Sequence, residues 1–303
     1  MPTSNSIRFN DRVAIVTGSG RGLGRQYALL LGALGASVVV NSTTPHTTQA
    51  TVNDIVNAGG KAVACVGSVS DESVAKALVD KAIDAFGRID IIINNAGVYE
   101  AMPFEQTTSA SLRDLLAIHV EGSYNLTRAA WPHMQKQKYG RVLMITSHSV
   151  FGMPGTSLYA AAKLAVVGLA KTLAVEGEAY NIHVNAVATT AFTEAVDKNL
   201  PNDEMRELMK KALPVAEPAP PVVWLTHEDC KVNGEVFGAQ GRIVSRILLA
   251  ETKGFQGLRR NEWMVETIRD NWDQVIDEKE YVVHTNGNNI GTILFGRLSH
   301  DLS

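Results

Sequence analysis

Short apolar runs alternate with longer segments of mixed polarity along residues 1–190. The runs are continuously apolar, which is typical of strands buried on both faces of a parallel sheet. They lie at Val13–Val16, Ser37–Val40, Lys61–Val66, Ile89–Ile93, Val142–Thr146 and His183–Val187. Segments of helical length lie between them, among them Gln26–Leu34, Ser73–Phe86 and Ser111–Gln135. This alternation predicts an α/β fold, a Rossmann-type doubly wound parallel sheet with right-handed crossovers.

The pattern changes after the sixth predicted strand. A polar helix is expected over Asn202–Leu213, and a last strand around Val236–Phe237. Further on, Glu262–Ile276 places apolar residues at helical spacing, so the tail has an apolar face to bury. We expect a catalytic domain over 1–250 and a C-terminal helical extension over 251–303, which packs on the body or on a partner subunit.

The composition of the chain argues against several classes of protein. The net charge of -3 argues against nucleic-acid binding, and no apolar run reaches the ~18 residues of a membrane span. The first ten residues lack the apolar core of a secretory signal, and two cysteines cannot form a disulfide framework. We therefore expect a cytoplasmic enzyme with a small-molecule substrate. The eight histidines lack the paired spacing of a metal site, so no metal is expected.

A glycine-rich turn follows the first strand and opens a helix, with the spacing T-G-x-x-x-G-x-G over Thr17–Gly24. Such a turn lets the backbone approach a phosphate, and the N–H groups of the helix N-terminus bind it. A plain structural turn is the alternative. The residues expected at a dinucleotide cofactor are Gly18, Ser19, Arg21, Gly22, Leu23 and Gly24.

The end of the second strand bears on the choice of cofactor. An acid there would bind the ribose hydroxyls of NAD and repel the 2′-phosphate of NADP. The chain has no acid between Asn41 and Thr51, while Ser42, Thr43 and Thr44 offer hydroxyls and Arg21 a cation. We therefore expect NADP(H) to be preferred over NAD(H).

Tyr159 and Lys163 stand four residues apart in a helical stretch, so they share a helix face. A free phenol has a pKa of about 10, too high for a base near neutral pH. The ammonium group and a positive nicotinamide would both favour the phenolate and lower the pKa of Tyr159. Ser147, twelve residues earlier, ends the fifth strand and could hold a substrate oxygen, with Ser149 as a competitor.

These residues resemble the short-chain dehydrogenase/reductase family. The resemblance rests on Thr17–Gly24, Asn94–Gly97, Ser147 and Tyr159 with Lys163, in this order, and covers residues 8–245. It implies that Tyr159 is the acid–base, that Lys163 binds the nicotinamide ribose and that Ser147 positions the carbonyl. The further cofactor contacts that we expect are Ser68, Val69, Asn95, Ala96, Gly97 and Val187.

Within the family, the chain resembles the (3R)-hydroxyacyl-CoA dehydrogenase unit of peroxisomal multifunctional enzymes of type 2. Segments 86–90, 118–132, 181–188 and 224–237 carry this likeness. It implies a dimer whose C-terminal extension packs over the cofactor region. It also places His119 where most relatives have an active-site Asn, so that His119 would support a proton-relay water. A simple helix-packing role for His119 is the alternative.

The chain also departs from that pattern. We expect a stand-alone dehydrogenase, because the hydratase and sterol-carrier segments are absent from the sequence. The Ser-to-Tyr interval is twelve residues rather than the usual thirteen. The other departures are Ser42 for the acid that fixes NAD, Arg21 for a small residue, Gly67 for an acid, and Thr189-Thr190 for Pro-Gly.

The sequence therefore predicts an NAD(P)-dependent oxidoreductase that interconverts a secondary alcohol and a ketone. A 3-hydroxyacyl-CoA/3-ketoacyl-CoA pair is the expected substrate, with Arg206, Lys210 and Lys211 available to CoA phosphates. A hydroxysteroid or other apolar alcohol is the alternative, with Phe151, Met153 and Phe192 lining its cleft. A non-catalytic dinucleotide-binding protein is a more remote alternative. A homodimer or homotetramer is expected.

Overall fold

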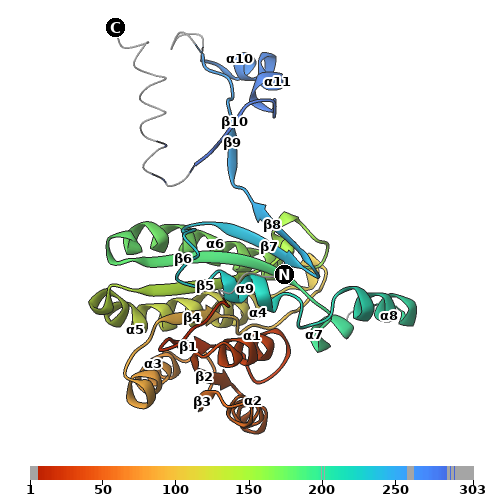
Figure 1. The fold of residues 1–303 in the computed structure, drawn as a ribbon. Coiled ribbons are helices and arrows are strands. Elements are labelled where there is room, and N and C mark those ends of the chain that lie inside the picture. Colours follow the sequence, from red (N-terminus) through yellow and green to blue (C-terminus); the bar gives the residue numbers. More distant parts are fainter. Residues whose placement is uncertain are drawn as a thin grey trace. The chain divides into compact units, whose positions relative to one another are not determined.

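The computed structural model describes residues 6–198, 200, 202–257, 263–284, 287 and 290. The chain forms two compact units that divide between Arg246 and Ile247, and each is described by itself. In the first unit, an eight-stranded sheet has the order β3-β2-β1-β4-β5-β6-β7-β8 (Figure 1). Its strands are β1 (Val13–Val16), β2 (Ser37–Ser42), β3 (Lys61–Val66), β4 (Ile91–Asn94), β5 (Gly140–Thr146), β6 (Ile182–Thr190), β7 (Val236–Gln240) and β8 (Ile243–Ile247).

All neighbouring pairs from β3 to β7 are parallel, which confirms the predicted doubly wound fold. The continuous apolar runs explain why these segments form central strands. Every residue of β1, β4 and β5 is buried, so both faces of these strands are covered. Each predicted strand is present in the structure. The observed strand ends differ from the predicted ones by up to three residues, as where β6 extends to Thr190.

Helices cover both faces of the sheet. The helices are α1 (Gly22–Ala33), α2 (Pro45–Asn57), α3 (Glu72–Phe86), α4 (Ser109–Leu116), α5 (Gly122–Gln137), α6 (Ser157–Gly177), α7 (Glu194–Asp197), α8 (Asp203–Ala212) and α9 (Ala219–Trp224). One core cluster joins alternate strand residues such as Ala14, Val16 and Val38 to α1, α2 and α9. Helices α3, α5 and α6 pack together on the other face. The predicted helix over Ser111–Gln135 is continuous but passes through a π-helical segment, Ala117–Glu121.

Helix α6 and the short 3-10 turn after it, Ser157–Tyr180, are long and apolar enough together to cross a membrane by length and composition. The sequence predicted no such segment, because Lys163 and Lys171 interrupt its apolar runs. In this fold the helix packs against β5 and β6, and the side chain of Lys163 is buried there.

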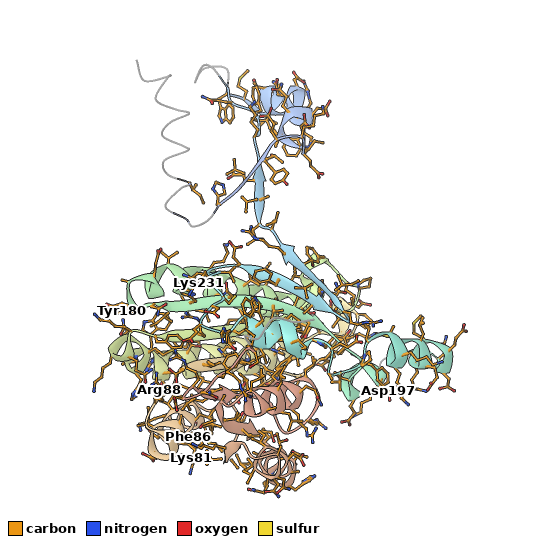
Figure 2. The ribbon with its side chains drawn as sticks, in the orientation of Figure 1. Lys81, Phe86, Arg88, Tyr180, Asp197 and Lys231 are labelled. Carbon is orange, nitrogen blue, oxygen red and sulfur yellow. The ribbon has the colours of Figure 1, made fainter. Side chains whose placement is uncertain are left out.

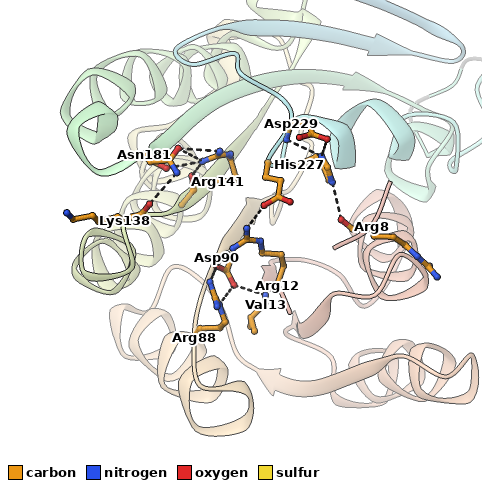
Figure 3. Close-up of polar contacts among 12 residues, drawn as sticks. Arg8, Arg12, Val13, Arg88, Asp90, Lys138, Arg141, Asn181, His227 and Asp229 are labelled. Atoms are coloured by element: carbon orange, nitrogen blue, oxygen red, sulfur yellow. Dashed lines mark hydrogen bonds and ion pairs between the residues drawn. The ribbon is translucent and has the colours of Figure 1, made fainter. Parts of the chain in front are cut away.

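A polar cluster fixes the amino ends of the central strands (Figure 3). Asp90, fully buried before β4, accepts hydrogen bonds from Arg88 and from the backbone N–H of Val13, the latter at 2.9 Å. Arg141 at the start of β5 is also buried and donates to the backbone oxygen of Asn181 at 2.9 Å. The charged groups of Asp90, Arg88 and Arg141 all bind partners that hold neighbouring strands together, so this cluster stabilises the fold.

The opposite, carboxyl ends of the strands therefore remain for chemistry. Figure 2 shows Arg88 and Tyr180 at one end of the first unit and Asp197, in α7, at the other.

The second unit contains β9 (Ala250–Thr252) paired antiparallel with β10 (Tyr281–Val283), and the short helices α10 (Val265–Asp270) and α11 (Trp272–Val275). The apolar pattern over Glu262–Ile276 predicted one helical stretch. The structure has two short helices that meet at Asn271, whose φ of -115° and ψ of 15° are not helical. Glu262 lies outside the described residues.

Candidate active site

The turn between β1 and α1 needs its glycines. Gly18 and Gly22 have φ of +63° and +57°, a region that residues with a Cβ rarely adopt. A Cβ on Gly24 would lie 2.4 Å from Nδ2 of Asn95 and 2.5 Å from the backbone oxygen of Gly18. The N-cap of α1, Arg21, makes no capping hydrogen bond through its side chain, and the first turn holds no acid. The N–H groups of the first turn of α1 are therefore available to an anion such as a pyrophosphate.

The loop after β4 is braced against this turn. Thr17 Oγ1 accepts hydrogen bonds from the N–H groups of Asn95 at 3.0 Å and Ala96 at 2.9 Å. The side-chain amide of Asn95 donates to the backbone oxygen of Thr17 at 2.8 Å. The loop and the turn thus meet at the carboxyl ends of β1 and β4, where the strand order reverses direction. In doubly wound sheets this is the place where ligands bind.

Asn41 is a structural residue of this region that sequence reasoning missed. It is buried at the end of β2, and its backbone oxygen accepts from the N–H of Ser19 at 2.7 Å. Its side-chain amide donates to the backbone oxygens of Cys65 and Gly67, each at 3.1 Å. Asn41 therefore fixes the glycine-rich turn to two strands. A single amide at the end of the apolar run Val38–Val40 was the signal for it.

The hydroxyl groups expected at a 2′-phosphate are partly engaged. The hydroxyl of Ser42 lies 2.6 Å from that of Thr48, and it donates to the backbone oxygen of Thr44 at 3.2 Å. Thr43 is exposed. Arg21 forms an ion pair with Glu194 at 2.8 Å, in which both side chains are largely exposed.

The other expected cofactor residues differ in exposure. Ser68 follows β3, and its hydroxyl lies 2.8 Å from that of Ser70. Val69 is buried against Gly122 of α5. Val187 is fully buried in the core on the side of α1 and α9, so the nicotinamide contact expected for it remains a prediction.

Ser147, Tyr159 and Lys163 come together where β5 ends beside α6. The hydroxyl of Ser147 lies close enough to the phenol of Tyr159 to lower its pKa. The Nζ atom of Lys163 lies 5.5 Å from the centre of the Tyr159 ring and donates to the backbone oxygen of Ile145 at 2.7 Å. Ser149, the competitor, is buried, and its N–H donates to Ser147 Oγ at 3.1 Å. The serine that faces the phenol is therefore Ser147.

Burial dominates the electrostatics of this group. Burial raises the pKa of Tyr159 to about 12, and the hydrogen bond from Ser147 offsets only part of that effect. Burial thus outweighs other effects on this phenol, and the lowering of its pKa by the Lys163 ammonium together with a positive nicotinamide remains a prediction. Burial also lowers the pKa of Lys163 to about 7, so its positive charge is itself disfavoured.

His119 lies against the phenol from within the π-helical segment. Its ring is 5.4 Å from that of Tyr159, edge to face, and its Nε2 lies 2.9 Å from the backbone oxygen of Val98. Burial, with the nearby charge of Lys163, lowers the pKa of His119 to about 3, so its ring is neutral. Its Nδ1 is buried and has no hydrogen-bond partner among the residues that the structure describes, so one polar atom beside the phenol is left for a water or a ligand.

Tyr99 is a second residue that sequence reasoning missed. Its ring packs edge to face on Tyr159, with 5.1 Å between the ring centres. Together with His119 it encloses the phenol on two sides. A tyrosine two residues after Gly97 carries no sequence signal of this contact, which depends on the path of the loop.

The residues proposed for the substrate end lie in exposed segments. Arg206 of α8 pairs with Asp197 and Asp203, so this guanidinium is already neutralised, whereas Lys210 and Lys211 are exposed. Phe151 and Met153 are exposed, and Phe192 is half-buried. Among the described residues, no group of three or more His, Cys, Asp or Glu side chains could hold a metal ion.

The chain is similar in sequence and in fold to proteins that are already known. The sequence profile of the short chain dehydrogenase family matches residues 12–205. The chain is 39% identical to mouse (Mus musculus) peroxisomal multifunctional enzyme type 2 over 285 residues, which cover 90% of this chain and 38% of that protein. The structure of the full-length Drosophila melanogaster enzyme superposes with a TM-score of 0.81 at 31% identity, covering 97% of this chain and 50% of that one.

A 7α-hydroxysteroid dehydrogenase, solved with NADH and 7-oxo glycochenodeoxycholic acid, superposes with a TM-score of 0.73 at 29% identity. The superposition covers 80% of this chain and 98% of the hydroxysteroid dehydrogenase chain. The match covers 38% of the mouse enzyme, 47% of the Drosophila melanogaster enzyme and 31% of a peroxisomal hydratase-dehydrogenase-epimerase of Saccharomyces cerevisiae, so the chain spans less than half the length of these relatives.

Proposed function

The chain belongs to the short-chain dehydrogenase family, and we propose that within it the protein interconverts a 3-hydroxyacyl-CoA and a 3-ketoacyl-CoA. It is an NAD(P)-dependent oxidoreductase that acts on CH–OH groups. The observation that carries the proposal is the grouping of Ser147, Tyr159 and Lys163 at the carboxyl ends of the strands.

The residues present fit a dinucleotide. A Cβ at Gly24 would collide with Asn95 and with the backbone of Gly18, so only glycine allows this close approach. The first turn of α1 presents N–H groups that no capping side chain binds. Gly18 to Gly24 would hold the pyrophosphate, and Asn95 to Gly97 would border the adenosine part. When bound, the nicotinamide accepts or supplies the hydride.

Side chains of the protein would transfer the proton to and from the substrate oxygen. Tyr159 would give its proton to the carbonyl oxygen during reduction and take it back during oxidation. Ser147 would donate to the same oxygen and stabilise its developing charge. Lys163 would hold the nicotinamide ribose, and His119 Nδ1 would bind a water that resupplies the proton. Positive charge at the nicotinamide would bring the high pKa of Tyr159 down in the complex.

A CoA thioester is favoured as substrate by the likeness to the multifunctional enzymes, together with exposed Lys210 and Lys211 on α8. A steroid ketone is the second candidate, which the exposed apolar side chains of Phe151 and Met153 and the likeness to a hydroxysteroid dehydrogenase favour.

We propose NADP(H) as the preferred coenzyme. Helix α2 begins at Pro45, three residues after the end of β2, and its N-cap Thr44 makes no side-chain capping bond. The N–H groups of its first turn would donate to a 2′-phosphate, and the sequence has no acid between Asn41 and Thr51 to repel it. Arg21 would have to leave Glu194 to contribute.

We further propose a homodimer that pairs through α6. The outer face of α6 carries an exposed stripe of small and apolar residues, Ala161, Leu164, Ala165, Gly168 and Val175. The division at residue 250 and the packing of the extension on the body or on a partner subunit remain predictions. A cytoplasmic location also remains a prediction, which Cys65 and Cys230, both free and buried, support.

The substitution Tyr159→Phe tests the mechanism. It removes the proton donor and keeps the ring, so turnover should fall by at least 100-fold while reduced coenzyme still binds. Tyr180→Phe, at the amino ends of the strands, is the matched control and should keep full turnover. Steady-state rates and coenzyme fluorescence measure the two effects. Retained turnover in Tyr159→Phe would refute the assignment.

A further inference from the structure

His148, the residue after Ser147, reaches across the ends of two strands. Its Nδ1 lies 3.3 Å from the hydroxyl of Thr190 at the end of β6, and its Nε2 lies 2.9 Å from Nε2 of Gln240 at the end of β7. Thr190 and Gln240 are direct partners across the two strands. A Cβ on Gly238 would lie 2.9 Å from the His148 ring, so a glycine there leaves room for it.

The donor and acceptor properties of His148, Thr190 and Gln240 determine where the proton of each group lies. The amide nitrogen of Gln240 can only donate, so Nε2 of His148 accepts. Burial lowers the pKa of His148, which keeps the ring neutral, so its one proton is on Nδ1. That N–H donates to the Thr190 oxygen. The hydroxyl proton of Thr190 is then left to donate to another group.

The register places Thr190 on the face of the sheet that bears the reacting groups. Thr146 pairs with Ala188 across β5 and β6, and the hydroxyl of Thr146 donates to the backbone oxygen of Lys163 at 2.6 Å. This face is therefore turned toward α6. Thr190 lies two residues beyond Ala188, on the same face and one step nearer the ligand end of the strand.

We propose that the hydroxyl of Thr190 binds a second acceptor oxygen of the substrate, and that His148 is the positioning residue that turns its proton outward. The inference rests on the proposed function. A 3-ketoacyl thioester has such an oxygen, the thioester carbonyl, next but one to the reacting carbon, whereas a lone ketone has none. The pair Thr190 and His148 thus selects 1,3-dicarbonyl substrates.

The first experiment compares Thr190→Val with Thr190→Ser, using acetoacetyl-CoA and the preferred reduced coenzyme. Loss of one hydrogen bond should raise the KM for acetoacetyl-CoA about tenfold in Thr190→Val. The KM for the coenzyme should stay unchanged, and Thr190→Ser should recover most of the loss. Thr189→Val, on the other face of the same strand, is the matched control and should leave the KM for acetoacetyl-CoA unchanged.

The second experiment tests the role of His148 through a double-mutant cycle. His148→Leu should raise the same KM, and His148→Asn, which keeps a donor near the position of Nδ1, should restore it in part. Because His148 acts through Thr190, His148→Leu combined with Thr190→Val should be no worse than Thr190→Val alone. Additive losses would contradict the positioning role.

The outcomes separate this inference from the proposed function. A wild-type enzyme that consumes no coenzyme with acetoacetyl-CoA refutes both. An active wild type with an unchanged KM in Thr190→Val refutes the inference alone. A raised KM for the coenzyme in Thr190→Val also refutes the inference, because Thr190 would then bind the nicotinamide amide and not the substrate.

Discussion

Two ionisable side chains beside Tyr159, those of Lys163 and His119, are almost entirely shielded from water. Burial lowers the pKa of both, to about 7 and about 3, because the charged forms lose their hydration. The site therefore holds an uncharged imidazole at neutral pH and a lysine whose charge depends on its ligand. An anionic or polar cofactor group against Lys163 would restore the ammonium form.

The lowered pKa of His119 has a consequence for acid stability. The folded chain binds fewer protons than the unfolded chain between pH 6.5 and 3, so its stability falls as the pH falls through this window. Between pH 6.5 and pH 4 the loss from this residue should be about 3 kcal/mol.

The variant His119→Asn removes the titrating group, so its unfolding free energy should drop less between pH 7 and pH 4 than that of the wild type. Urea unfolding at the two pH values measures the difference. Exposed His46, replaced by Asn, is the control and should follow the wild type. An equal drop in His119→Asn would mean that the imidazole is hydrated in the folded chain.

At the scale of elements, the phosphate cradle depends on how closely α1 approaches the loop after β4. A Cβ on Gly24 would lie 2.4 Å from Asn95 Nδ2, so Gly24→Ala must push the loop away. We expect a loss of at least tenfold in coenzyme affinity, measured by fluorescence titration. Lys81→Ala, at an exposed position on α3, is the control and should leave the affinity unchanged. Equal affinity in the two variants would show that the cradle is flexible enough to accept a side chain.

The sequence predicted the sheet well, because strands buried on both faces leave a continuous apolar signal that tolerates few alternatives. It also predicted that Lys163 and Ser147 lie near Tyr159, since i and i+4 share a helix face and Ser147 ends a strand. The pKa of Tyr159 could not be predicted, because it depends on how deeply the ring is buried.

Contacts between distant loops left no periodic signal. The packing of Tyr99 on Tyr159 and the ion pair of Arg21 with Glu194 depend on the paths of irregular segments. The link from His148 to Thr190 and Gln240 needs the register of three strands, which the apolar pattern does not specify to one residue.

At the scale of the whole molecule, the exposed stripe on α6 predicts self-association. A charge placed on it would have to be buried in the paired state, so Leu164→Glu should shift the protein from dimer to folded monomer in analytical ultracentrifugation. Val56→Glu, a similarly exposed apolar position on α2, should leave the assembly unchanged. A dimer that persists in Leu164→Glu would place the interface elsewhere.

The proposed reaction of this chain is the reduction of 3-ketoacyl-CoA thioesters. The most direct measurement is the initial rate of coenzyme consumption with a 3-ketoacyl-CoA, run in parallel with NADPH and with NADH and beside a steroid ketone. We predict consumption with the thioester, and a higher kcat/KM with NADPH than with NADH. If both coenzymes bind and neither is consumed with the thioester while the steroid ketone is reduced, the claim is contradicted.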